Sequence, residues 1–103
     1  MYVVGREDLG PGLLAAQLCH ALRQFSNDHP EIDKNWFINS NYICLLSVNS
    51  EEELLNLSKK CDELNLCYSK FLEPDLNNSL TAICLEPGKL SKKLVSKFKL
   101  AFS

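Results

Sequence analysis

The sequence predicts a single α/β domain spanning residues 1–103, with a mixed four-stranded sheet and helices on both of its faces. Strand-like apolar segments alternate with segments of helical spacing, which favours parallel strands joined by helical crossovers. Only a short polar loop separates the last two strand-like segments, which favours an antiparallel pair. A length of 103 residues fits one domain, and 46% hydrophobic residues are enough for its core.

In the N-terminal part, the pattern predicts a strand at residues 2–6 and a helix at residues 12–26. Pro11 suits the first turn of a helix, because its missing N–H would have no partner there. The helix ends at the breaker segment 27–30. Its apolar stripe consists of Leu14, Leu18, Ala21, Leu22 and Phe25.

The next segments are predicted to cover the sheet and then to enter it. Residues 31–40 form either a short second helix or an ordered loop, and we expect Trp36 and Phe37 to cover the sheet. Residues 42–48 are an almost continuous apolar run, which is typical of a strand buried on both faces.

A helix is predicted to begin at Glu51, because Ser50 and Glu53 have the spacing of a capping box. Asn65 can adopt the left-handed conformation that ends a helix. The expected buried face consists of Leu54, Leu57, Cys61 and Leu64.

Two further strands are expected at residues 66–72 and 80–85, joined by a loop at 73–79 that is rich in turn-forming residues. A final helix is predicted at residues 89–97, while residues 99–103 show no clear pattern. One side of that helix is expected to present Leu90, Leu94 and Phe98.

No segment of the sequence indicates a membrane span or a metal site. No apolar run approaches the roughly 18 residues of a membrane span, and the first residues lack a signal-peptide pattern, so we expect a cytoplasmic protein with no membrane partner.

Because no cysteines have zinc-ligand spacing, we expect no metal and five free, buried thiols. The five are Cys19, Cys44, Cys61, Cys67 and Cys84. Neighbouring helical positions point apart, so Cys19 and His20 are not expected to form a nucleophile–base pair.

Charge is distributed unevenly along the chain. The net charge of −2 argues against general nucleic-acid binding. However, residues 88–103 contain five lysines and no acid. Such a segment can contact phosphate groups or can form the solvated face of a helix. The candidate phosphate contacts are Lys89, Lys92 and Lys93.

A second, narrower face of the first helix contains Gln17 and His20 together with Leu13 and Ala16. The amide of Gln17 can donate and accept hydrogen bonds, and His20 can act as an acid, a base or a donor. The alternative is structural, with a buried histidine and a buried glutamine that are hydrogen-bonded to a neighbouring strand.

The loop before the last predicted strand offers two carboxylates, Glu73 and Asp75, and two hydroxyls, Ser79 and Thr81. Ser79 and Thr81 are two residues apart and so are expected on one side of a strand. A carboxylate near a hydroxyl can hold and polarise a water molecule. The alternative is an ordinary polar turn.

Three segments resemble a known family. Residues 2–9 (YVVGREDL) and 14–21 (LAAQLCHA) are similar to the opening of the type-II peptidyl-tRNA hydrolases, which has a Val-Val-Arg-x-Asp-like strand and a helix reading Ala-x-Gln-x-x-His-Ala. Residues 79–87 (SLTAICLEP) are similar to the family's Thr-x-Thr-x-Leu-x-Ile-x-Pro strand. The segments occur in the family's order, and the resemblance extends from the first residues to residue 87.

The resemblance implies a mixed four-stranded sheet, a homodimer, no metal or organic cofactor, and tRNA as the partner. It implies cleavage of the ester that joins a peptide or an N-blocked amino acid to the 3′ end of tRNA. Either Glu73 or Asp75 would orient the water, and Ser79 and Thr81 would donate hydrogen bonds. The supporting residues would be Asp8, Gln17 and His20, and the tRNA contacts would be Lys89, Lys92 and Lys93.

One departure from the family pattern leaves the activity open. The family's turn between the first strand and first helix is rich in lysine, and one of these lysines is thought to be catalytic, whereas residues 10–13 are Gly-Pro-Gly-Leu. This departure also resembles a divergent branch, the peptidyl-tRNA hydrolase domain-containing proteins. Three functions therefore remain: a peptidyl-tRNA hydrolase, a degenerate relative that binds tRNA or a protein, and a hydrolase of another small ester or amide.

Overall fold

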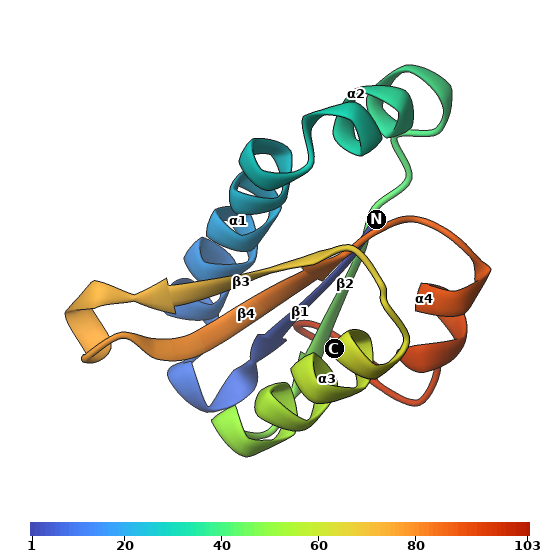
Figure 1. Cartoon of the computed structure of the whole chain (residues 1–103). Helices are drawn as coiled ribbons and strands as arrows, with labels where there is room; N and C mark the ends of the chain where they lie inside the picture. The colour runs from blue at the N-terminus through green and yellow to red at the C-terminus, as the bar shows by residue number, and fades with distance from the viewer.

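The computed structural model describes the whole chain, from Met1 to Ser103. It contains four helices and five strands, with short 3-10 turns after β1 and β3 (Figure 1). In chain order the helices and strands are β1 (Tyr2–Arg6), α1 (Pro11–Asp28), α2 (Pro30–Asn39), β2 (Cys44–Val48), α3 (Glu51–Glu63), β3 (Tyr68–Glu73), β4 (Ser79–Leu85), α4 (Lys89–Leu94) and β5 (Lys99–Leu100).

All five strands belong to one mixed sheet with the order β3-β4-β1-β2-β5. β1 and β2 run parallel, whereas β4 is antiparallel to both β1 and β3. The predicted α/β class is therefore confirmed. The predicted count of four strands misses β5, whose Lys99 and Leu100 pair with Ser47 and Leu46 at one edge. A strand of two residues is too short to produce the alternation that predicts a strand.

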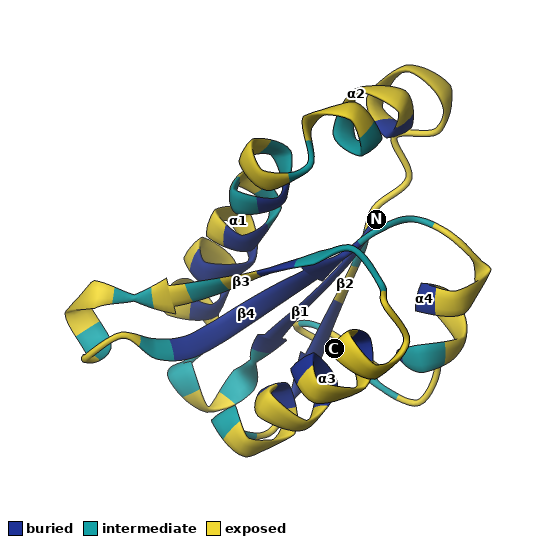
Figure 2. Cartoon of the chain, viewed as in Figure 1, coloured by how far each residue is buried: buried dark blue, intermediate teal, exposed yellow.

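Helices cover both faces of the sheet, as predicted. α1 and α2 lie on one face, and α3 and α4 lie on the other (Figure 1). The central strands β1 and β4 are buried along most of their length (Figure 2). Successive residues of β1 enter different cores: Val3 packs beneath α1, while Tyr2 and Val4 pack on the side of α3. No helix is both long enough and apolar enough to cross a bilayer.

The segment after α1 forms the helix alternative, α2. Trp36 is buried in the core beneath α1, and its indole Nε1 donates a hydrogen bond to the Tyr42 carbonyl at 2.7 Å. The prediction that Phe37 also covers the sheet is wrong, because 66% of it is exposed. Adjacent helical positions point in different directions, so one short helix cannot place both aromatics on the sheet.

The prediction that residues 42–48 are buried on both faces holds only for Leu46, Ser47 and Val48. β2 begins at Cys44, and Tyr42, Ile43 and Leu45 are exposed. Leu46 packs in the core on the side of α3, which turns its neighbour Leu45 to the opposite face. That face is open here because α1 packs over β1, β4 and β3.

The start of α3 follows the predicted capping pattern. The Ser50 hydroxyl accepts a hydrogen bond from the Glu53 N–H at 3.4 Å, and the Glu53 carboxylate accepts one from the Asn49 N–H at 2.6 Å. At the other end, Asn65 adopts the left-handed conformation with φ of 54°. Leu64 was expected on the buried face but is 45% exposed, because the helix ends at Glu63.

α4 is shorter than predicted, and the expected apolar side is only partly covered. Ser91 and Val95 are buried, whereas Leu90 is 46% exposed and Leu94 and Phe98 are only partly buried. Leu90, Leu94 and Phe98 nevertheless lie on one side, as predicted, because all three line the same hollow against α3.

All five cysteines are free, as predicted, but only Cys61 and Cys84 are buried. Burial raises the pKa of each of these two thiols to about 12, which makes them poor nucleophiles. Cys44 and Cys67 are half-buried, and Cys19 is exposed.

Gly5 allows α1 to pack closely on β1, so we expect Gly5→Ala to lower the free energy of unfolding by about 1–3 kcal/mol. A Cβ atom at this position would lie 2.4 Å from Leu14 Cδ1 and 3.0 Å from Leu18 Cδ2. Gly12→Ala is the matched control, because a Cβ there meets nothing within 4 Å. Urea titrations of both variants measure the effect, and Gly12→Ala is expected to be neutral or stabilising. Equal stability of the two variants would contradict the close packing.

Candidate active site

The buried side-chain amide of Gln17 joins α1 to the hairpin formed by β3 and β4. Its Nε2 donates to Glu73 Oε1 at 2.9 Å, and its Oε1 accepts from Thr81 Oγ1 at 2.6 Å. An ionised carboxylate only accepts hydrogen bonds, so the amide nitrogen must face Glu73 and the Thr81 hydroxyl must be the donor. The first helix and the acidic turn therefore meet at one fully assigned network.

A β-bulge in β4 turns Thr81 toward this network. The pairing of β3 with β4 shifts between Phe71, which faces Ala82, and Leu72, which faces Leu80. Leu80 packs in the core on the side of α3 and Ala82 in the core beneath α1, so Thr81 is the extra residue. Its hydroxyl reaches Gln17 on the face of the sheet that α1 covers.

Glu73 is the carboxylate that the structure brings into the network. Its pKa is lowered, first by the hydrogen bond from Gln17, then by the backbone N–H of Asp75 at 3.3 Å from Oε2, and further by the nearby charge of His20. Glu73 therefore stays ionised at neutral pH. A fixed carboxylate of this kind can accept a proton from a water molecule.

The other two predicted residues of the turn differ in position. Ser79 is paired directly with Glu73 across the hairpin, which places both side chains on the same face of the sheet. Asp75 is exposed in the 3-10 turn, and it contributes its backbone N–H to Glu73. The turn continues through Asn77 and Asn78, which adopt left-handed conformations with φ of 56° and 59°.

His20 lies one turn along α1 from Gln17, and the alternative of a buried, strand-bonded histidine is wrong. It is exposed, and its ring stacks on Phe71 with centroids 4.5 Å apart and 15° between the planes. Sequence reasoning missed Phe71, although it lies two residues before Glu73 and therefore on the same face of β3. Cys19 points elsewhere and lines an apolar hollow between α1 and β2, so it does not pair with His20.

Asp8 contacts the network only indirectly, through Arg6. The Arg6 guanidinium bonds both Asp8 carboxylate oxygens at 3.1 and 2.8 Å, which lowers the pKa of Asp8, and it also donates to the Leu80 carbonyl at 3.2 Å. On the other side, the Leu80 N–H donates to the Glu51 carboxylate at 2.8 Å. Side chains thus hold both backbone groups of the residue that precedes Thr81. Sequence reasoning missed Arg6 and Glu51.

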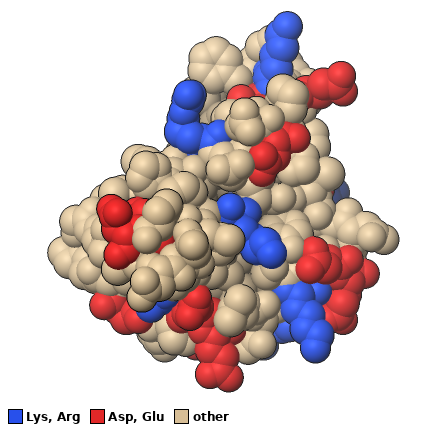
Figure 3. All heavy atoms as spheres, turned by 60° about the vertical axis from the view of Figure 1, so that its left-hand side comes forward, with Lys and Arg blue, Asp and Glu red and all other residues tan.

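The predicted tRNA contacts are not close to this network. Lys89, Lys92 and Lys93 lie on α4, which packs on the opposite face of the sheet (Figure 1). On the face viewed in Figure 3, acidic and basic side chains are interspersed, with no continuous patch of one sign. No group of three or more His, Cys, Asp or Glu side chains could hold a metal ion.

The fold and the network define a small α/β domain with a carboxylate–amide–hydroxyl centre between its first helix and its last hairpin. The family model described as peptidyl-tRNA hydrolase PTH2 matches residues 1–101. The chain belongs to the peptidyl-tRNA hydrolase PTH2 family, which confirms the resemblance found in the sequence. None of the curated proteins gives a significant match.

If Gln17 lowers the pKa of Glu73, Gln17→Leu should raise that pKa toward the ordinary value of 4.5. In the native protein the folded pKa lies below the unfolded one. Ionisation of Glu73 therefore stabilises the fold above pH 4.5 and loses this effect as the pH falls through the lowered value. An NMR titration of the side-chain carboxyl carbon measures the change.

The matched control for this titration is Gln24→Leu, which removes an amide that bonds Asp28 on the same helix at 2.9 Å. This variant should leave the titration of Glu73 unchanged. An unshifted Glu73 in Gln17→Leu would show that the amide does not tune the carboxylate.

Proposed function

We propose that this protein hydrolyses the ester that joins a peptide or an N-blocked amino acid to the 3′ end of tRNA, with Glu73 orienting the attacking water. The observation that carries the proposal is the hydrogen bond from the buried Gln17 amide to Glu73, in a chain of the PTH2 family. This hydrogen bond holds an ionised carboxylate in place where α1 meets the β3–β4 hairpin. Glu73 rather than Asp75 is therefore the proposed base.

The proposed reaction is one displacement at the ester carbonyl. Glu73 accepts a proton as the water oxygen attacks the carbonyl carbon, and the proton then passes to the ribose oxygen as the ester C–O bond breaks. The products are a peptide carboxylate and a tRNA with a free terminal hydroxyl. Ser79, which is paired with Glu73, is the proposed donor to the developing oxyanion.

Thr81 and His20 take different proposed roles in this reaction. The Thr81 hydroxyl donates a hydrogen bond to the Gln17 amide oxygen, so it positions the amide rather than contacting the ester. The exposed His20 ring, stacked on Phe71, offers a flat aromatic surface beside Glu73. Bases at the single-stranded end of a tRNA stack on such surfaces, at about 1–3 kcal/mol per base.

The lysines of α4 take no part in the proposed reaction, because α4 packs on the opposite face of the sheet. The turn at residues 10–13 supplies no lysine either. Loss of one transition-state donor costs about 10²–10³ in rate, so we expect slower turnover than in relatives with the lysine-rich turn. A homodimer and a cytoplasmic location are proposed from the family resemblance alone.

The lysine-free turn favours a second candidate function, that of a relative which binds tRNA or a protein without cleaving an ester. The hydrolase and the tRNA-binding relative both predict contact with the acceptor end of tRNA near Glu73, whereas a protein-binding relative predicts no such contact. Only the hydrolase predicts that the ester is cleaved.

Glu73→Gln should slow the release of N-acetyl-amino acid from N-acetyl-aminoacyl-tRNA by roughly 10², because it removes the base and keeps the size of the side chain. Asp75→Asn should slow release much less, since its carboxylate lies outside the network. Glu63→Gln, on the opposite face, is the neutral control. Release is measured under single-turnover conditions.

Two results would count against the hydrolase. Equal rates for the wild type and Glu73→Gln would remove Glu73 from the reaction. A wild type that binds tRNA but releases no more amino acid than buffer would support the binding function.

A further inference from the structure

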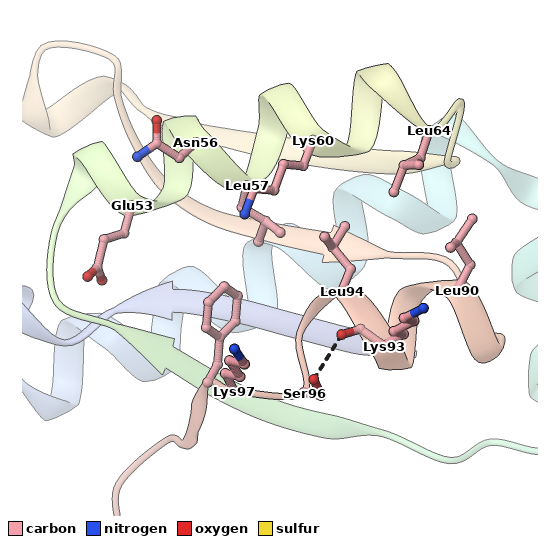
Figure 4. Close-up of a pocket in the computed structure, with 11 residues that line it drawn as sticks. Glu53, Asn56, Leu57, Lys60, Leu64, Leu90, Lys93, Leu94, Ser96 and Lys97 are labelled. Carbon is pink, nitrogen blue, oxygen red and sulfur yellow. Dashed lines mark hydrogen bonds between the residues drawn. The ribbon is translucent and has the colours of Figure 1, made fainter.

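A groove lies between α3 and α4, on the face of the sheet opposite Gln17 and Glu73 (Figure 4). Its volume is about 570 Å³, within the range of binding pockets in proteins. Nothing in the proposed reaction uses it. Its lining includes Leu64, Leu90, Leu94, Lys60, Lys93 and Lys97.

Apolar side chains from both helices meet in this groove. Figure 4 shows Leu64, which directly follows α3, pointing across the groove toward Leu90 and Leu94 of α4. Leu64 is 45% exposed and Leu90 is 46% exposed, while Leu57 and Phe98 continue the apolar surface down to the core. Covering these side chains would remove apolar surface from water and so stabilise a complex.

Positive charge surrounds this apolar surface. Lys60, Lys93 and Lys97 are exposed, and none of them forms an ion pair, because the two ion pairs of the chain are Arg6–Asp8 and Glu7–Lys99. The one acid in the lining is Glu53, whose carboxylate already accepts a hydrogen bond from the Asn49 N–H. The groove is thus positive in a chain with a net charge of −2.

We propose that the groove binds an acidic amphipathic helix of a partner protein. Leucine-like side chains of that helix, spaced at i, i+3 or i+4 and i+7, would cover Leu64, Leu90 and Leu94. Carboxylates on its flanks would meet Lys60, Lys93 and Lys97. RNA fits less well, because a phosphate backbone offers no apolar surface to cover the leucines. The groove is also open along both helices, which suits a helix better than a single acyl chain.

A designed peptide tests this proposal on the full chain. The probe is a fluorescein-labelled helix of roughly 15 residues, about four turns, with leucines at the stated spacing and glutamates on both flanks. In a titration of ¹⁵N-labelled protein, amide shifts should concentrate in residues 57–64 and 89–98 and spare Gln17, Glu73 and Thr81. Added salt should weaken binding, because the flanking contacts are between exposed charges.

Three variants separate the groove from the rest of the surface. Lys60→Glu combined with Lys97→Glu, and Leu90→Glu alone, should each weaken binding by at least about tenfold, a change of roughly 1.4 kcal/mol. Lys34→Glu, an exposed change on α2, should leave binding unchanged. Leu90 and both lysines are at the surface, and circular dichroism checks that each variant is folded. Hydrolysis by these variants should equal that of the wild type, which keeps this test separate from the proposed reaction.

Three outcomes would overturn the proposal. These are no binding of the probe, equal binding of a peptide with the same composition in scrambled order, and stronger binding of tRNA or anionic vesicles that is lost in the same variants. The last result would assign the groove to nucleic acid or to lipid instead of a protein helix.

Discussion

The side-chain amide of Gln17 forms two hydrogen bonds that hold α1 over the β3–β4 hairpin. Burying an amide is costly unless its donor and its acceptor are both paired, and here Glu73 and Thr81 supply the partners. The partners are 56 and 64 residues away in the chain. The network therefore forms only when α1 is packed on the hairpin with Gln17 beside Glu73 and Thr81. Gly5 permits this packing, because it leaves room for two leucines of α1 on β1.

Thr81 reaches Gln17 because the pairing of β3 with β4 is irregular at that point. The bulge places Thr81 and Ala82 on one face. The pairing of β1 with β4 ends at Ala82, so the backbone of Leu80 has no partner on β1. Arg6 and Glu51 then bond the two backbone groups of Leu80. In this arrangement Asp8 acts at a distance, by holding Arg6. The carboxylate, the hydroxyls and the stacked His20–Phe71 pair all lie on the α1 face, while the lysine-rimmed groove lies on the other.

Local patterns predicted the fold well, and contacts between distant residues were the part they could not predict. The Ser50 cap and the left-handed Asn65 depend on neighbours within one helical turn, so the sequence reveals them. The two-residue β5 has no period to detect. For the site, spacing alone could not separate Gln17 from an ordinary buried glutamine, and the family motif drew attention to it. The same motif could not choose between Glu73 and Asp75, because that choice depends on which carboxylate reaches Gln17.

The central claim is that Gln17 acts on the reaction through Glu73, and a double-mutant cycle on the single-turnover rate of ester hydrolysis tests it most directly. The four proteins are the wild type, Gln17→Leu, Glu73→Gln and the double variant, each measured where it is fully folded. The account predicts that Gln17→Leu slows the wild type but slows Glu73→Gln little further. Independent effects that multiply in the double variant, or a Gln17→Leu variant that keeps the full rate, would contradict it.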